Sequence, residues 1–139
     1  IFNKNKRLLK NFKIVREFQD DLPLVFIDYR LFEQAIANII LNAANYSPIN
    51  TRITVRITTS ADSLVIIVND QGSGIVIEER TKIFNKFYRV AGSINGGTGL
   101  GLYIAKEILD LHKASIQVET GEDNIGTEFI IRLPLNNGK

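Results

Sequence analysis

Apolar side chains recur along the chain with two different periods, which predict helices and strands. Helical spacing predicts one helix over residues 29 to about 46 and another over residues 100–111. Residues 78–84 fit a third, short amphipathic helix with acidic side chains in its first turn. Alternation of apolar and polar residues, or a short apolar run, predicts strands at residues 11–18, 52–58, 64–68, 114–119 and 128–133.

The connections between these elements indicate how they are arranged. Asp28 is expected to cap the first helix, and the apolar run 24–27 fits either a further strand or an extended lead-in. The tight connection at residues 60–63 predicts a hairpin, and the all-apolar run 64–68 predicts a central strand. Because strand pairs alternate with helices, the sequence predicts an α+β fold. About three helices are expected on one face of a largely antiparallel sheet of about five strands.

Composition narrows the classes of function. The 139 residues fit one domain, and 17 Lys and Arg against 15 Asp and Glu leave a net charge of +2. This surplus is too small to indicate nucleic acid or a membrane surface as the main partner. The chain has no cysteine, which excludes disulfides, thiolate metal sites and cysteine nucleophiles. The one histidine, His112, follows the last helix, where a cation suits the dipole, and a structural role is favoured over catalysis.

Asparagines form the first candidate site. Asn38, Asn42 and Asn45 are spaced by four and three residues, which places their amides on one strip of the first helix. Asparagine is a poor helix former, so helix propensity does not explain three asparagines within eight residues of this helix. An amide oxygen suits Mg²⁺, although a polar helix face beside a buried surface explains the strip equally well.

A carboxylate and two glycines form the second candidate site. Asp70 ends an apolar strand and is followed by Gly72 and Gly74 in the pattern Asp-x-Gly-x-Gly. A half-buried acid needs a donor, which the exocyclic amine of adenine supplies, and the glycines allow a flat ring to approach the backbone. When this motif is considered alone, an ordinary turn is the simpler interpretation.

Glycines crowd the start of the last helix as the third candidate. Residues 96–102 read Gly-Gly-Thr-Gly-Leu-Gly-Leu, and backbone N–H groups at such a helix start bind anions. The segment is neither a Walker A loop nor a Rossmann fingerprint. A phosphate site is favoured over a flexible linker, because the glycines continue to the helix boundary.

The order of these motifs resembles the ATP-binding domain of sensor histidine kinases, over residues 10 to 135. The wider group includes DNA gyrase, mismatch-repair ATPases and the large heat-shock chaperones. The resemblance implies a two-layer α/β sandwich with a mixed, mostly antiparallel sheet, known as the Bergerat-type ATP-binding fold. It also implies a mobile ATP lid over about residues 85–98, with ATP and Mg²⁺ as ligands.

The resemblance assigns roles residue by residue. Residues 38–46 resemble the N box, in which Asn42 matches the Mg²⁺ ligand, Asn38 lies near the phosphates and Tyr46 lies beside the nucleotide. Residues 70–74 resemble the G1 box, 84–89 the F box and 97–102 the phosphate-wrapping G2 box. Asp70 would accept from adenine, with Thr127 helping through water. The implied nucleotide-binding residues are Asn38, Asn42, Asn45, Tyr46, Asp70, Gly72, Gly74, Ile75, Lys86, Arg89, Gly97, Thr98, Gly99, Leu100, Gly101, Leu102 and Thr127.

Two positions depart from the family pattern. Asn45 stands where the family often has Lys or Arg, so one cation near the phosphates is missing unless Lys86 or Arg89 supplies it. Lys86 itself replaces the usual proline of the F box. The departures predict a lower nucleotide affinity or a different lid geometry.

The resemblance also narrows the reaction. Asn38 stands where the ATPase branches carry a water-activating Glu, and an amide cannot act as a base. No catalytic residue is assigned, and Asn38 is the one candidate. The implied function is phosphoryl transfer from ATP to a histidine on a separate dimerisation domain, expected before Ile1, with a response regulator as an indirect partner. The domain is expected in the cytoplasm, without membrane contact, as part of a membrane-anchored sensor kinase.

Alternatives stay open at this point. One is a serine-kinase anti-sigma factor of the same fold, and another is a docking module that has lost nucleotide binding. Within the histidine kinases, residues 21–25 together with Asp28 and residues 32–34 resemble the KdpD-type sensor kinases.

Overall fold

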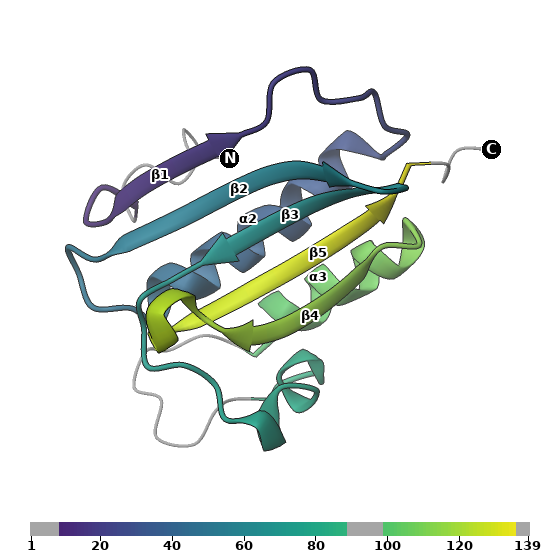
Figure 1. The fold of residues 1–139 in the computed structure, drawn as a ribbon. Coiled ribbons are helices and arrows are strands. Elements are labelled where there is room, and N and C mark those ends of the chain that lie inside the picture. Colours follow the sequence, from purple (N-terminus) through teal and green to yellow (C-terminus); the bar gives the residue numbers. More distant parts are fainter. Residues whose placement is uncertain (1–8, 89–98, 136–139) are drawn as a thin grey trace.

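The structure is a computed structural model that describes residues 9–88 and 99–135 (Figure 1). In these residues five strands form one sheet in the order β1-β2-β3-β5-β4, in which β1 pairs parallel with β2 and the other pairs are antiparallel. The strands are β1 (Lys13–Phe18), β2 (Arg52–Ser60), β3 (Ser63–Asn69), β4 (Ser115–Thr120) and β5 (Thr127–Pro134). The predicted mixed, mostly antiparallel sheet is confirmed, with β3, which contains the apolar run 64–68, at its centre.

Two long helices cover one face of this sheet (Figure 1). They are α2 (Tyr29–Asn45) and α3 (Gly101–Leu111), which pack against each other and against the strands. The apolar stripe of α2 is buried, with Ile39 and Ala43 fully inaccessible to solvent. Each buried Ile contributes roughly 1.5–3 kcal/mol to folding. The two-layer arrangement is therefore confirmed.

The N-terminus of α2 is held at two points. The Asp28 carboxylate accepts a hydrogen bond from the Leu31 N–H at 3.1 Å, so the predicted cap is confirmed. The Asp28 N–H in turn donates to Nε2 of His112 at 2.9 Å. Because Nε2 accepts, Nδ1 carries the proton and donates to the Ile108 carbonyl, also at 2.9 Å. His112 thus has a structural role, as the sequence favours, because it ties the start of α2 to the end of α3.

The predicted helix over residues 78–84 is wrong. The chain instead forms two 3₁₀ turns, η1 (Ile77–Glu79) and η2 (Lys82–Phe84), each closed by a bond between residues three apart. Seven residues provide too few hydrogen bonds to repay helix nucleation, so tertiary contacts decide the local shape. Arg80, between the two turns, donates from Nε to the Ile75 carbonyl and from its guanidinium to the Thr120 hydroxyl.

The segment before α2 contains no strand. Residues 24–27 belong to no strand of the sheet and connect β1 to α2 as an extended lead-in. Leu24 is 97% exposed and Phe26 68% exposed, whereas Val25 and Ile27 are partly buried and pack against the core. Of the two interpretations of this run, the lead-in is the correct one.

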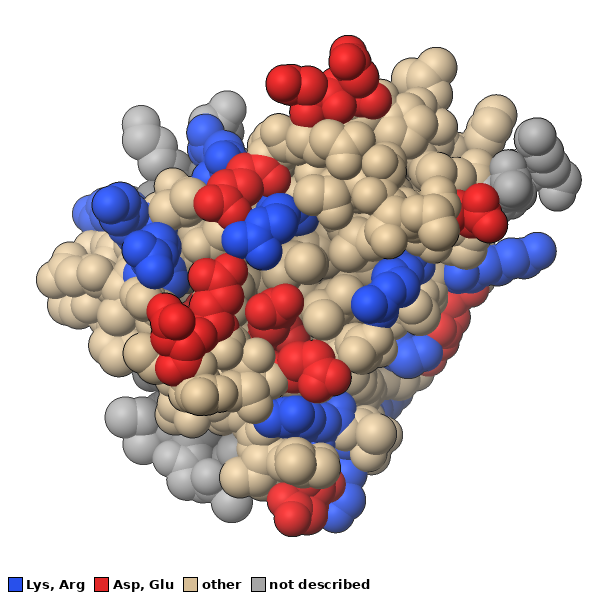
Figure 2. All heavy atoms as spheres, viewed as in Figure 1, with Lys and Arg blue, Asp and Glu red and all other residues tan. Residues whose placement is uncertain are grey.

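Charges of both signs are mixed on the open face of the sheet (Figure 2). Arg56 on β2 bridges Glu17 at 2.7 Å and Glu122 at 3.1 Å, and the hydrogen bond that Arg56 donates to Glu17 raises the pKa of Arg56 above its ordinary value. This face carries no extended basic patch, in agreement with the small net charge. In residues 9–88 and 99–135, no helix is long and apolar enough to cross a membrane.

Candidate nucleotide-binding site

Asp70 lies at the end of the central strand β3 and is only 3% exposed. Its Oδ1 atom accepts hydrogen bonds from the N–H groups of Gly72 at 2.9 Å and Thr127 at 3.1 Å. Its own N–H donates to the Thr127 carbonyl at 2.9 Å, so two bonds tie the end of β3 to the start of β5. The other oxygen, Oδ2, makes no hydrogen bond to any residue that the structure describes.

Burial dominates the electrostatics of this carboxyl group. It raises the pKa of Asp70, and the two N–H donors of Gly72 and Thr127 only partly offset that effect. A buried oxygen without a donor is costly. The site is therefore built to receive a hydrogen-bond donor at Oδ2.

Two glycines allow the backbone to close around Asp70. A Cβ atom on Gly72 would lie 2.3 Å from the carbonyl oxygen of Tyr46, so only glycine lets this turn pack on the end of α2. Gly126 has φ +73°, and a Cβ there would lie 2.1 Å from the Asp70 carbonyl oxygen. Gly126 was not among the predicted site residues, although its place directly before Thr127 in the sequence was a signal.

The rest of the predicted G1 box follows Asp70 as a turn. Gly74 adopts φ +80°, a conformation that side chains disfavour, and Ile75 packs against the hydrophobic core. The turn thereby directs the chain away from the end of β3. Thr127, on the other side of Asp70, is 4% exposed.

The asparagine strip of α2 faces the start of α3. Asn38 donates from Nδ2 to the Gly101 carbonyl at 3.1 Å. Asn42 lies one helical turn further along, is half-buried, and its amide hydrogen bonds to no described residue. Asn45 and Tyr46, at the end of the strip, are also half-buried. The structure thus brings the N box to the helix start that carries the G2 glycines.

The first turn of α3 can bind an anion. Among the described residues no side chain caps this helix, and a Cβ on Gly101 would meet nothing within 4 Å. The backbone N–H groups of a first helical turn have no partner inside the helix, so they are available to phosphate oxygens. Leu100 directly precedes α3, and Leu102, the second residue of α3, packs against the hydrophobic core. Arg89, Gly97 and Thr98 lie outside the described residues, together with most of the predicted lid.

The chain enters and leaves the segment 88–98 at neighbouring points. The Phe87 N–H donates to the Gly99 carbonyl at 2.9 Å, and both residues have positive φ, at 65° and 76°. A Cβ on Gly99 would lie 2.7 Å from the Phe87 backbone, which explains this glycine. Lys86 is exposed, and its ammonium lies 5.5 Å from the ring centre of Phe87 and 5.8 Å from that of Tyr103.

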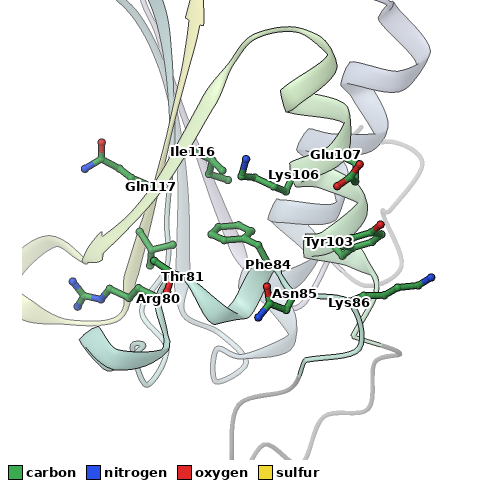
Figure 3. A pocket seen from close by; sticks show the side chains of 11 residues that line it. Arg80, Thr81, Phe84, Asn85, Lys86, Tyr103, Lys106, Glu107, Ile116 and Gln117 are labelled. Atoms are coloured by element: carbon green, nitrogen blue, oxygen red, sulfur yellow. The ribbon is translucent and has the colours of Figure 1, made fainter.

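A separate groove of about 550 Å³ lies between η2, α3 and β4 (Figure 3). Phe84 and Ile116 line its apolar part, and Lys106 extends from α3 beside them. Lys106 is already paired with Asp110 at 2.5 Å. Of the predicted nucleotide-binding residues that the structure describes, only Lys86 lines this groove. The groove is therefore distinct from the site around Asp70.

The family follows from comparison with known proteins. Residues 27–137 match the family described as histidine kinase-, DNA gyrase B-, and HSP90-like ATPase. Since this match covers most of the chain, the chain belongs to that family.

Relatives within the family are sensor kinases. The chain is 38% identical over 134 residues to histidine kinase P4 of Formosa agariphila and 37% identical over 130 residues to sensor protein RprX of Bacteroides fragilis. These alignments cover 92% and 90% of this chain but 10% and 25% of those two proteins. The chain thus spans a quarter or less of the length of these relatives.

Solved structures agree in fold. The mycobacterial sensor histidine kinase MprB has a TM-score of 0.85 at 28% identity, over 96% of this chain and 88% of that chain. The catalytic domain of histidine kinase ThkA has a TM-score of 0.82 at 25% identity, with the same coverage. The expected class, a catalytic ATP-binding domain of the sensor histidine kinase type, is confirmed. The KdpD-type subfamily stays a prediction.

Proposed function

We propose that this domain binds MgATP and donates its γ-phosphoryl group to a histidine on a separate dimerisation domain of a sensor kinase. The observation that carries the proposal is the buried Asp70 carboxylate, whose Oδ2 has no hydrogen-bond partner among the described residues. The exocyclic amine of adenine is a donor of the required kind. The uncapped start of α3 supports a phosphate chain at the other end of the site.

Asn42 would hold Mg²⁺ in this proposal. Its amide makes no hydrogen bond within the described residues, and an amide oxygen is a neutral hard ligand that Mg²⁺ accepts beside phosphates and water. When bound, the ion neutralises phosphate charge during phosphoryl transfer. Tyr46 would lie beside the nucleotide, and Thr127 would support Asp70 at the adenine.

The start of α3 would hold the phosphates. Gly99, Leu100 and Gly101 would present backbone N–H groups, and the N-terminal end of the helix dipole favours negative charge. Gly97 and Thr98 would extend this cradle, and Lys86 or Arg89 would supply the cation that Asn45 does not. These assignments, the core limits of residues 10–135 and the lid over 85–98 stay predictions.

Asn38 supports transfer to a protein nucleophile over hydrolysis. An amide cannot take a proton from water, and Asn38 already donates to the Gly101 carbonyl. A site that positions ATP without a water-activating base suits delivery of the phosphoryl group to a histidine. His112 cannot be that acceptor, because both of its ring nitrogens are hydrogen-bonded within the helical layer.

The partners follow from this role. The direct partner would be the dimerisation domain of the same sensor kinase, and a response regulator would receive the phosphoryl group from that domain. We also place the domain in the cytoplasm, where ATP is available, with any membrane anchor in another part of the protein. The names of the relatives, which are sensor proteins and histidine kinases, support this proposal.

The test is phosphoryl transfer from γ-labelled ATP and Mg²⁺ to a purified, histidine-bearing dimerisation domain of a sensor kinase. The expected product carries label that acid removes and alkali does not, as for phosphohistidine, with negligible phosphate release when the acceptor domain is omitted. Acid-stable label on serine would favour the anti-sigma-type kinase instead. If the domain shows neither phosphoryl transfer nor ATP binding, the docking module is the interpretation that remains.

A further inference from the structure

Asp70 is flanked in sequence by two residues with amide side chains, which bond to two different segments of the chain. Asn69, before it, accepts a hydrogen bond at Oδ1 from the Glu122 N–H at 3.0 Å. Gln71, after it, accepts at Oε1 from the Arg52 N–H at 2.8 Å. Each bond joins the end of β3 to a segment at least 19 residues away in sequence. The G1 turn is therefore fastened on both sides of Asp70.

The Asn69 bond fastens the turn that precedes β5. Asn69 is 5% exposed, and a Cβ on the adjoining Gly121 would lie 3.1 Å from its Oδ1. The Gly121 N–H donates to the Gly126 carbonyl at 3.0 Å, which closes the turn around residues 122–125. Gly126 packs on the Asp70 backbone, and the next residue supplies the Thr127 N–H to Oδ1. Asn69 thus holds the segment that orients one face of the Asp70 carboxylate.

The Gln71 bond fastens the other side. Arg52 is the first residue of β2, and β2 pairs with β3 along seven residues ending at Asn69. Gln71 lies past the end of that ladder, so its side chain extends the connection between β2 and the G1 turn by one bond. The next residue, Gly72, donates the second N–H to Oδ1. Gln71 thus holds the other donor of the Asp70 carboxylate in place.

We infer that Asn69 and Gln71 are positioning residues that aim the free oxygen of Asp70 and thereby set the preference for adenine over a purine without the exocyclic amine. The inference rests on the proposed function, because it concerns the same base-binding site. Neither residue would touch the nucleotide in this scheme. A small rotation of the carboxylate would cost the bond to the amine while leaving phosphate and ring contacts in place.

Base discrimination provides a readout that general destabilisation does not move. ADP carries an amine where inosine diphosphate carries a carbonyl oxygen, so the ratio of their dissociation constants reports the aim of Asp70. Gln71→Met keeps the length of the side chain and removes the acceptor, whereas Gln71→Glu keeps an acceptor. We expect the preference for ADP to fall by about tenfold in Gln71→Met, because ADP binds more weakly while the affinity for inosine diphosphate is unchanged. In Gln71→Glu the preference should be largely retained.

A matched control exists at the other end of β2, where Gln19 bonds to Thr59. The Gln19 side chain accepts from the Thr59 N–H at 2.9 Å, at the far end of β2, so Gln19→Met removes the same kind of bond away from the site. This variant is expected to lose some stability and to keep the wild-type ratio. Asn69→Leu, tested in the same way, is expected to behave as Gln71→Met does.

The outcomes separate this inference from the proposed function. A wild-type domain that does not prefer ADP to inosine diphosphate would contradict the assignment of Asp70 to adenine. The positioning roles alone would be overturned if the wild type prefers ADP and the folded variants Gln71→Met and Asn69→Leu are equally selective. An equal loss of selectivity in Gln19→Met would also overturn them, because it would trace the effect to stability.

Discussion

The Asn38 side chain donates a hydrogen bond to the Gly101 carbonyl at 3.1 Å, across 63 positions of sequence. This bond joins α2, which carries the candidate metal ligand Asn42, to the first turn of α3, which would hold the phosphates. The two halves of the site are therefore coupled by a direct contact as well as by helix packing. A change at Asn38 should affect the phosphate half of the site even without a bound metal.

Asn38→Asp removes the donor and places a carboxylate against the Gly101 carbonyl. We expect a loss of about 1–3 kcal/mol in the free energy of unfolding and weaker binding of ADP, with adenosine affinity little changed. Urea denaturation and calorimetry measure the two effects. Gln34→Glu, at an exposed position one helical turn before Asn38, is the matched control and should change stability by less than about 0.5 kcal/mol. Equal losses for adenosine and ADP would argue against the coupling.

Asp70→Asn replaces the charged acceptor by an amide of the same shape. Its oxygen can still accept from Gly72 and Thr127, but an NH₂ group takes the place of Oδ2 and opposes the adenine amine. We expect ATP affinity to fall at least about tenfold, in a domain that remains folded. The measurement is titration of both proteins with the same nucleotide. An unchanged affinity would remove Asp70 from the base site.

The pH dependence of the stability of the nucleotide-free domain should also reveal the raised pKa of Asp70. Burial raises its pKa in the folded state above the ordinary value of 3.8, so folding favours the protonated form. The contribution of Asp70 to stability is therefore fully present below about pH 4 and is lost as the pH rises through the raised pKa. At neutral pH the wild type keeps a buried carboxylate that Asp70→Asn lacks.

It follows that the stability of Asp70→Asn relative to the wild type should increase between about pH 4 and pH 7. Urea denaturation of both proteins across this range gives the difference directly. A difference that is constant or decreases with pH would show that the N–H donors of Gly72 and Thr127 outweigh burial.

Gly126→Ala tests the close approach that shapes the adenine side of the site. The added Cβ would lie 2.1 Å from the Asp70 carbonyl oxygen, on a backbone with φ +73°. We expect a loss of more than about 2 kcal/mol in the free energy of unfolding. Gly101→Ala is the control, since its Cβ meets nothing within 4 Å in a helix, and it should gain about 0.5–1 kcal/mol. Similar stabilities for the two variants would contradict the packing around Asp70.

Periodic patterns account for the parts of the fold that could be predicted. The apolar stripe of α2 and the apolar run of β3 bury large continuous surfaces, so local sequence and tertiary packing agree there. Residues 78–84 carry a helical pattern too short to nucleate a helix, and the contacts of Arg80 with Ile75 and Thr120 decide the outcome.

The candidate site was predictable to the extent that motifs mark it. Asp70, Asn38 and the glycines at the start of α3 stand at recognisable spacings, and the structure brings Asn38 to Gly101 as the motif order implies. The contacts of Asn69 and Gln71 carry no such mark. They join a side chain to a backbone N–H 53 and 19 positions away, a relationship that no local pattern encodes.

The most direct test of the account is calorimetric titration of the domain with a non-hydrolysable ATP analogue, with and without Mg²⁺. We expect binding with a dissociation constant on the order of micromolar, strengthened by Mg²⁺ in the wild type and much less so in Asn42→Ala. Absence of binding under both conditions, in a folded domain, would contradict it.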